Sequence, residues 1–433
     1  MGAAGLASGP AGARPAGRAA RRTGASVRAV LLIAFAAVPF TYAELLLGGL
    51  LLRPWTLVLA VMVPLVLAMP INLRAVRHLL PYLAWLAYGA LTLSWTLAPG
   101  PGMSFLGQLA LPAAGYLLAW RARADEIRGP LARLSFWGIV AAAVMTVLSL
   151  RGLIGPETFS TRPTAMAVAA LFVVATMDAR SLPYIGLTTA LALVVTFGTG
   201  SRMAAAVVIL MLLLSPALLS RGGVRLLVAA GCVLLVIAVS GTGAFRERFF
   251  FSQDATLTDV LTLQQDVNTA GRREAWPRLI RECSTAQPEG LGLWSASVLS
   301  KRLTGGVLDH PHNEYIRVYC DTGWGGLALF CLFLVTALAR SAWGVLRGPD
   351  PRLHLAAGLL VLAYALFAVT DNPLVYSAQF AGPVLIVLGL SDRLLPARRR
   401  RDRQVVWTGE TWFGPRRQAG VPAVPGTPGG SAG

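Results

Sequence analysis

Long apolar runs, separated by short polar connections, dominate the sequence from Val30 to Leu395. A helix needs roughly 20 mainly apolar residues to cross the hydrocarbon core of a bilayer. The pattern therefore predicts an all-α polytopic membrane protein with about twelve transmembrane helices. These helices are expected near residues 29–47, 51–70, 79–97, 107–121, 132–150, 163–179, 183–199, 203–219, 224–242, 321–343, 353–370 and 375–395.

The composition agrees with a membrane protein and changes the interpretation of the charge. Hydrophobic residues make up 55% of the 433 residues and charged residues only 13%, and the mean hydropathy is +0.62. The net charge of +18 comes mainly from arginines in the short connections between apolar runs. This distribution favours anionic membrane lipids as partners and argues against nucleic-acid binding, which needs a folded basic surface.

Arginine residues concentrate in every second connection between the predicted helices. The intervening connections carry fewer, among them Arg53, Arg151, Arg162 and Arg202. The basic set comprises Arg74, Arg77, Arg121, Arg123, Arg128, Arg133, Arg180, Arg221, Arg225, Arg340, Arg347, Arg352 and Arg398 to Arg401. Because basic connections stay on the cytoplasmic side, both termini are expected in the cytoplasm and residues 243–320 outside.

The chain divides into three parts by composition. Residues 1–27 and 396–433 are rich in Gly, Pro and Arg, and we expect them to be disordered cytoplasmic tails. Residues 28–395 form the predicted transmembrane domain. Its external loop, 243–320, lies between the ninth and tenth helices and is too long for a simple linker, so it should contain structure of its own.

Two features of this loop lead to separate expectations. Arg272–Arg281 places Trp276, Leu279 and Ile280 on one helical side, which predicts an amphipathic helix on the membrane surface. Cys283 and Cys320 are expected on the same side of the membrane, and the sequence leaves open whether they form a disulfide. The four cysteines show no metal-ligand spacing.

The most polar passage near the membrane runs from Asp309 to Arg317 and contains His310-Pro311-His312. Proline is favourable at a first helical position, so a helix is expected to begin near Pro311, with His312 in its first turn. The positive end of the helix dipole disfavours a protonated imidazole there. His312 is therefore a candidate general base. The alternative is a simple loop-to-helix turn at a membrane surface.

Further ionisable residues are expected on the same external side: Arg202 at the outer end of the seventh or eighth helix, Arg272 and Arg273 in the loop, and Asp371 at the end of the eleventh helix. Such residues at membrane depth commonly face a cavity or a partner, although the alternative is that each extends to the interface. Arginine binds phosphate through two parallel hydrogen bonds, so the set suits a diphosphate leaving group. No paired Asp motif or metal-ligand cluster accompanies it, and no metal or cofactor is expected.

Short motifs in this region resemble those of the O-antigen ligase and O-antigen polymerase superfamily. His312-Asn313-Glu314-Tyr315-Ile316, followed by Gly323-Trp324-Gly325-Gly326, is similar to the family's His-Asn-x-Tyr-Leu…Gly-x-x-Gly. Ser201-Arg202 resembles its Ser-Arg, and Gly271-Arg272 with Trp276 resembles its Gly-Arg-x-x-x-Trp. With the number of helices and the position of the loop, the resemblance covers roughly residues 28–395.

The resemblance implies a C-type glycosyltransferase-like fold in the bacterial cytoplasmic (inner) membrane, with the active site facing outside. It implies transfer of a glycan from an undecaprenyl-diphosphate-linked donor to a glycan, lipid or protein acceptor, without a metal. His312 would be the base, and Arg202, Arg272 and the adjoining Arg273 would bind the diphosphate. Supporting roles are expected for His310, Asn313, Tyr315 and Asp371. His310 is expected to orient the loop, paired with Asp309.

Two questions stay open in the sequence. No residue separates a ligase from a polymerase, since the two differ only in the acceptor. Ser160-Thr161-Arg162-Pro163 stands where members of the family often have Asn-Pro-Asn, so no role is assigned there. An alternative of another class is a transporter whose arginines line a cavity for an anionic solute. The sequence shows no convincing internal repeat of the kind that many transporters have.

Overall fold

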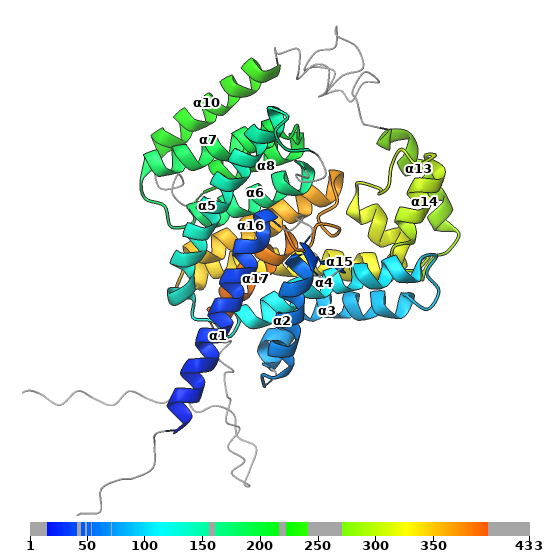
Figure 1. Cartoon of the computed structure of the whole chain (residues 1–433), viewed down its shortest axis with the longest axis horizontal. Helices are drawn as coiled ribbons and strands as arrows, with labels where there is room; N and C mark the ends of the chain where they lie inside the picture. The colour runs from blue at the N-terminus through cyan, green and yellow to red at the C-terminus, as the bar shows by residue number, and fades with distance from the viewer. Residues whose placement is uncertain are drawn as a thin grey trace, which may run out of the picture. The chain divides into compact units, whose positions relative to one another are not determined.

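The computed structural model describes residues 15–40, 45–47, 50–52, 54–70, 72–155, 161–215, 222–240 and 271–396. These residues form α-helices almost throughout (Figure 1). The helices are α1 (Pro15–Ala37), α2 (Pro54–Leu67), α3 (Leu73–Thr92), α4 (Pro99–Ala119), α5 (Ala124–Leu150), α6 (Thr161–Thr176), α7 (Leu182–Gly198), α8 (Arg202–Leu213), α10 (Gly222–Ser240), α13 (Arg272–Ser284), α14 (Ser295–Leu303), α15 (Glu314–Arg347), α16 (Pro351–Thr370) and α17 (Ala381–Arg393). A 3-10 turn η1 (Val38–Phe40) and a short antiparallel pair, β1 (Leu45–Leu47) and β2 (Leu50–Leu52), complete the described elements.

Every predicted transmembrane segment overlaps one of these helices. Four of the helices in the described residues are long and apolar enough to cross a membrane. They are α4, α5, α15 and α16. The chain is therefore an integral membrane protein, while crossing by the other eight helices stays a prediction. α1 starts at Pro15, within the segment 1–27 that the sequence predicts to be disordered. Residues 1–14 and the tail from 397 onward lie outside the described residues.

The helices pack around α15, α16 and α6. α15 contacts α3 and α16, while α17 contacts α4 and α16. α6 is enclosed by α5, α7, α8 and α16, so that each residue from Pro163 to Met177 is buried. Its sequence supports this position, because alanines let neighbouring helices approach closely and gain dispersion contacts. The first turn of α6, which carries Arg162, is consequently held in a fixed place.

Polar side chains cross-link the connections at one end of this helical bundle. Arg74 donates to the Leu395 carbonyl, Arg393 donates to the Ala122 carbonyl, and Arg128 pairs with both Asp178 and Asp350. The start of α6 and the end of α16 lie at the opposite end. The basic connections thus share one end, which is the arrangement that the alternation of arginines predicts. Which end faces the cytoplasm stays a prediction.

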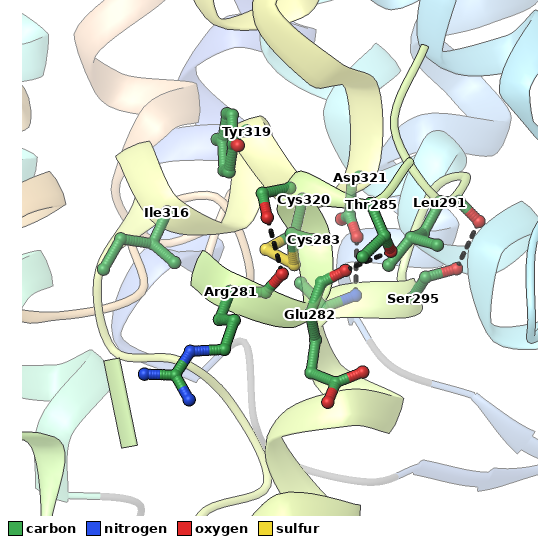
Figure 2. Close-up of a disulfide and its surroundings, with 12 residues drawn as sticks. Arg281, Glu282, Cys283, Thr285, Leu291, Ser295, Ile316, Tyr319, Cys320 and Asp321 are labelled. Carbon is green, nitrogen blue, oxygen red and sulfur yellow. Dashed lines mark hydrogen bonds between the residues drawn. A yellow bond between two sulfur atoms is a disulfide. The ribbon is translucent and has the colours of Figure 1, made fainter. Parts of the chain in front are cut away.

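Residues 271–313 contain α13 and α14, which pack against each other and against the start of α15 (Figure 1). We refer to residues 271–313 as the lobe. It has a small core of its own, formed with the first turns of α15 by Leu279, Cys283, Ala296, Leu299, Tyr319 and Cys320. Cys283 and Cys320 form a disulfide between α13 and α15, with Cα atoms 5.0 Å apart (Figure 2). The structure therefore contains the pairing that the sequence leaves open.

The predicted amphipathic helix is present as α13, but its apolar side packs mainly on protein. Leu279 is buried in the lobe core, and the Trp276 indole donates to the Pro311 carbonyl at 2.7 Å. Only Ile280 of the three apolar residues is exposed. α14 and α15 thus cover part of this side, and contact with the membrane surface stays a prediction for the exposed Ile280.

α15 changes direction at Gly323, within the Gly323-Trp324-Gly325-Gly326 motif. Gly323 has φ 62°, in the left-handed region that favours glycine. A β-carbon at this position would overlap the Pro288 carbonyl, so only glycine allows the lobe to approach α15 this closely. The motif glycine has a structural reason that is independent of any chemistry.

Candidate functional site

The loop that carries His310, Pro311 and His312, which we call the histidine loop, enters α15 in a way that the sequence does not predict. α15 begins at Glu314, and Asn313 is its N-cap, accepting a hydrogen bond from the Ile316 amide at 3.0 Å. The expectation of a helix start near Pro311 is wrong, because the Asn313 side chain caps the helix and satisfies one of its free amides. His312 therefore precedes the helix, with φ 53°. A left-handed non-glycine residue costs about 1 kcal/mol or more and is frequent at functional sites.

The His312 ring is buried between groups from three other segments. Its Nε2 lies 3.1 Å from Arg162 Nη1, and its Nδ1 lies 2.8 Å from Asn372 Nδ2 and 3.8 Å from Asp371 Oδ1. Arginine can only donate, so Nε2 accepts and the neutral ring carries its proton on Nδ1. The Asn372 side-chain amide is then assigned in the flipped orientation, in which its oxygen, rather than its nitrogen, faces His312 and accepts from Nδ1–H. That oxygen otherwise has no partner among the described residues.

Burial lowers the pKa of His312, and the positive charges of Arg272 and Arg162 lower it further. The nearby Asp371 carboxylate opposes this shift and raises the pKa. His312 is thus neutral at neutral pH, as the sequence predicts, but for another reason. Desolvation and two arginines, rather than a position in the first helical turn, keep the proton off Nε2.

The Arg272 guanidinium makes one hydrogen bond through Nη1 and keeps its Nε donor unpaired among the described residues. Its Nη1 donates to the Thr370 carbonyl at 2.7 Å, at the end of α16. Its Nε is buried without a hydrogen-bond partner among the described residues, and so is the Thr370 hydroxyl oxygen. Burial lowers the pKa of Arg272, Asp371 opposes this effect, and Arg162 adds to it. Arg272 and the adjoining Thr370 therefore have buried hydrogen-bonding capacity that an oxyanion can satisfy.

His310 faces away from this cluster. Its Nδ1 lies 3.0 Å from the Ser297 hydroxyl, and its ring packs edge-on against Trp294 with centroids 5.3 Å apart. Burial, followed by the charge of Arg317, lowers the pKa of His310 to about 3. The expected pairing with Asp309 is wrong, because the exposed Asp309 carboxylate lies 3.4 Å from Lys301 Nζ. His310 anchors the loop to α14 instead.

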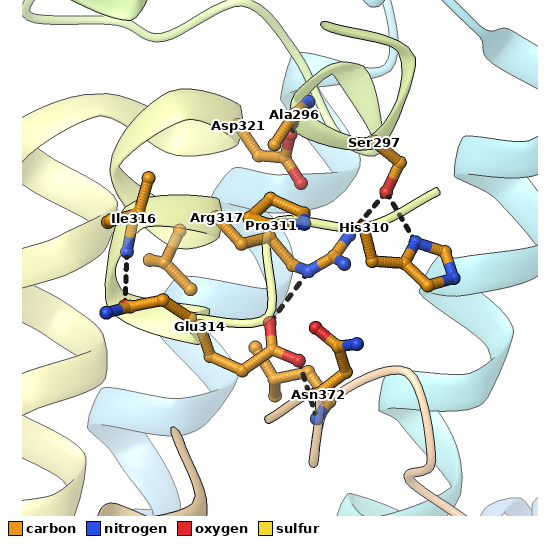
Figure 3. Close-up of polar contacts among 12 residues, drawn as sticks. Ala296, Ser297, His310, Pro311, Glu314, Ile316, Arg317, Asp321 and Asn372 are labelled. Atoms are coloured by element: carbon orange, nitrogen blue, oxygen red, sulfur yellow. Dashed lines mark hydrogen bonds and ion pairs between the residues drawn. The ribbon is translucent and has the colours of Figure 1, made fainter. Parts of the chain in front are cut away.

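A buried polar network beneath the histidine loop joins the lobe to α15 and to the turn after α16 (Figure 3). The buried Arg317 donates through Nη1 to Ser297 at 2.7 Å, and its Nε lies 2.7 Å from Glu314 Oε2 as an ion pair. Glu314 also accepts from the Leu374 amide at 3.2 Å. Asp321 accepts from the Trp294 and Ala296 amides. Breaking a buried pair of this kind typically costs about 3–5 kcal/mol, so the network fixes the loop.

Sequence reasoning missed this network and Arg162. The only signal for the network was the charged pair Glu314 and Arg317, three residues apart on one helical face next to apolar sequence. The only signal for Arg162 was an arginine at the predicted outer end of a membrane helix. Neither signal identifies a partner that lies far away in the sequence.

The remaining predicted residues divide between the site and the scaffold. Arg202 is the first residue of α8, half-buried, at the same end of the bundle as the start of α6. Arg273 follows Arg272 in α13, and its side chain lies outside the described part of the chain. The Tyr315 hydroxyl donates to the Ala365 carbonyl at 3.0 Å and so fastens α15 to α16. Asn313 acts as the helix cap described above.

The structure thus defines an integral membrane protein that gathers His312, Arg162, Arg272, Asp371 and Asn372 at one end of a helical bundle. Within the described residues, no cluster of three or more His, Cys, Asp or Glu side chains could hold a metal ion. Residues 187–331, about a third of the chain, match the family described as O-antigen ligase. The match confirms that the chain is related to the O-antigen ligase and polymerase superfamily. No curated protein matches the chain.

Proposed function

We propose that this protein transfers a glycan from an undecaprenyl-diphosphate-linked donor to an acceptor hydroxyl at the outer face of the cytoplasmic membrane. The observation that carries the proposal is a neutral, buried His312 that contacts Arg162 and lies beside Arg272. A proton acceptor and groups suited to a diphosphate thus occupy one small region. The family match supports glycan transfer of the ligase or polymerase kind.

In the proposed reaction, the acceptor oxygen attacks the anomeric carbon of the donor and forms the new glycosidic bond, with inversion. Its proton passes to His312 Nε2. The bond between the anomeric carbon and the diphosphate oxygen breaks, and its electron pair stays on the leaving diphosphate. Asn372 accepts from Nδ1–H. The Asp371 carboxylate, 3.8 Å from Nδ1, stabilises by its charge the imidazolium that forms.

Arginine side chains stabilise the leaving diphosphate in this proposal. Arg272 offers its buried, unpartnered Nε while Nη1 stays on the Thr370 carbonyl. Arg202 and Arg273 are proposed as further diphosphate ligands. Arg202 starts a helix at this end of the bundle, and Arg273 adjoins Arg272 in sequence. Hydrogen bonds between ionised partners are roughly twice as strong as neutral ones, which suits them to this task.

The test compares two histidines in one loop. His312→Ala is expected to lower turnover by about 10²–10⁴ because the base is lost, while the purified protein still binds the lipid-linked donor. His310→Ala removes only the contact with Ser297 and is expected to weaken turnover by less than about 10-fold. Product formation from a fixed amount of lipid-linked donor is the measurement, with donor binding measured separately.

Near wild-type turnover in His312→Ala would show that the base lies elsewhere, with Asp371 as the next candidate. Movement of the donor or another anion across the membrane by wild-type protein, without any product, would indicate a transporter instead.

A further inference from the structure

Arg162 is hydrogen-bonded to His312 Nε2, the atom that accepts the proton in the proposed reaction. Its Nη1 lies 3.1 Å from His312 Nε2, the nitrogen that would accept the proton of the acceptor hydroxyl. An imidazole nitrogen with its lone pair in a hydrogen bond cannot take a proton at the same time. The arrangement with Arg162 in place is therefore inactive, and the base functions only after this contact breaks.

The backbone and the side chain of Arg162 are held to different degrees. Its backbone belongs to the first turn of α6, whose following residues are all buried, so the Cα position is fixed. The residue itself is exposed, and an arginine side chain has several rotatable bonds. The guanidinium can thus swing while its point of attachment stays in place.

An anionic diphosphate is a stronger partner for Arg162 than a neutral imidazole. The guanidinium can bind phosphate oxygens with two parallel hydrogen bonds and an ion pair, whereas the ring offers one lone pair. Arg272, with its unpartnered Nε, lies close enough to Arg162 for their charges to affect each other. An anion bound by Arg272 is thus within reach of Arg162.

We propose that Arg162 covers His312 Nε2 in the empty enzyme and moves onto the diphosphate when the donor binds. This proposal rests on the proposed function and adds an order of events to it. The base becomes free only when a donor is present, so the donor must bind productively before the acceptor. Arg162 is a positioning residue for His312 in the empty site and a diphosphate ligand in the donor complex.

The first experiment observes His312 directly, because the chain contains only four histidines. Nitrogen-15 NMR of histidine-labelled protein in detergent gives the state of each ring nitrogen, and His312→Gln assigns the signal. Inorganic diphosphate serves as the probe. In wild-type protein, the Nε2 signal is expected to move from a hydrogen-bonded acceptor position towards that of a free nitrogen as diphosphate is added. In Arg162→Gln the Nε2 signal should already lie at the position of a free nitrogen without diphosphate.

The second experiment measures the dependence of kcat/KM on pH. The charged groups facing His312 are Arg162 from α6, Arg272 from α13 and Asp371 after α16, with neutral His310 in the same loop. A base must be unprotonated, so kcat/KM falls as the pH drops below the pKa of His312 in the free enzyme. Removing Arg162 removes one charge that lowers this pKa. Arg162→Gln should therefore shift the acidic limb to higher pH.

Arg162→Lys is the conservative variant, and Arg151→Gln is the matched control, because Arg151 is an exposed arginine at the same end of the bundle. The Lys variant should keep the wild-type acidic limb, since the charge remains. The KM for the donor should rise about 10- to 100-fold in Arg162→Gln, as expected for one lost hydrogen bond to a charged group, and less in Arg162→Lys. Arg151→Gln should behave as wild type.

The outcomes separate this proposal from the function on which it rests. If wild-type protein neither binds diphosphate nor forms product, the proposed function fails. If diphosphate binds and product forms, but the Nε2 signal does not respond and the acidic limb of Arg162→Gln is unchanged, only the role of Arg162 is overturned.

Discussion

Arg272 reaches the site with one of its nitrogens already engaged. Nη1 is fixed on the Thr370 carbonyl, which orients the plane of the guanidinium and leaves the buried Nε without a partner among the described residues. A lysine placed there could donate to the carbonyl or to a phosphate, but its single nitrogen cannot hold both groups in fixed directions. The residue thus has two tasks that require the planar fork.

Arg272→Lys is therefore expected to lower transfer by about 10-fold or more although the charge is kept. The measurement is product formation at several donor concentrations, with protein abundance determined in parallel. Arg278→Lys is the matched control, because Arg278 is an exposed arginine of the same helix. Full activity in Arg272→Lys would refute a diphosphate role for this residue.

For single residues, the sequence identifies candidates for the site better than it identifies the residues that they contact. His312, Arg272 and Asp371 stand out because ionisable groups are rare and costly in an apolar chain. Their partners do not stand out. The contact between Arg162 and His312 spans 150 positions of the sequence, and it depends on how α6 packs within the bundle. The comparison of motifs gives no reason to assign a role to Arg162.

Among the elements, α13 determines where Arg272 lies relative to His312. Its N-terminus carries Arg272, Trp276 in its second turn holds the Pro311 carbonyl, and its C-terminal end is joined to α15 through Cys283 and Cys320. The helix is thus attached at both ends to the segment that contains His312. A disulfide that closes a loop of this size typically contributes about 3–4 kcal/mol.

Loss of the disulfide is expected to disturb the site more than the membrane helices. Cys283→Ser combined with Cys320→Ser should lower transfer severalfold and increase proteolysis within residues 271–313. Cys232→Ser, which changes a cysteine of α10 that is free in the described structure, is the control. Reductant should lower the activity of wild-type protein to that of the double variant and leave the activity of the double variant unchanged. Wild-type activity after reduction, verified by thiol labelling of both cysteines, would contradict the argument.

The elements differ in how well the sequence predicts them. Apolar runs locate the helices from α1 to α10 and from α15 to α17, because length and hydropathy are local properties. The start of α15 is missed by three residues, since capping by Asn313 outweighs the preference of Pro311. α14 is missed because Ser295–Leu303 is short and polar and becomes helical by packing in the lobe core. The β1–β2 pair is missed because its leucines are equally compatible with a membrane helix.

In the molecule as a whole, the arginine-rich connections and the candidate site lie at opposite ends of the helical bundle. The basic connections are tied together by Arg74, Arg128 and Arg393 at one end, and the candidate site lies at the other. Two independent arguments orient this arrangement. Arginine-rich connections stay in the cytoplasm, and a disulfide such as Cys283–Cys320 persists in an oxidising compartment outside it. Both arguments predict that the lobe and the candidate site face outside.

Labelling of single cysteines in intact cells tests this orientation. Replacing Cys232 and Cys331 removes the cysteines that are free in the described residues, while the disulfide stays intact and does not react with maleimide. Val307 in the lobe and Arg352 at the start of α16 are both exposed, so a cysteine at either position is accessible.

An impermeant maleimide should label Val307→Cys in intact cells, and Arg352→Cys only after the membrane is permeabilised. The physical reason is that moving either connection across the bilayer would place the arginine-rich end outside and the disulfide in a reducing compartment. Labelling of Arg352→Cys but not Val307→Cys in intact cells would reverse the topology. A reversed site would face the cytoplasm, and the proposed transfer at the outer face would then be excluded together with the topology.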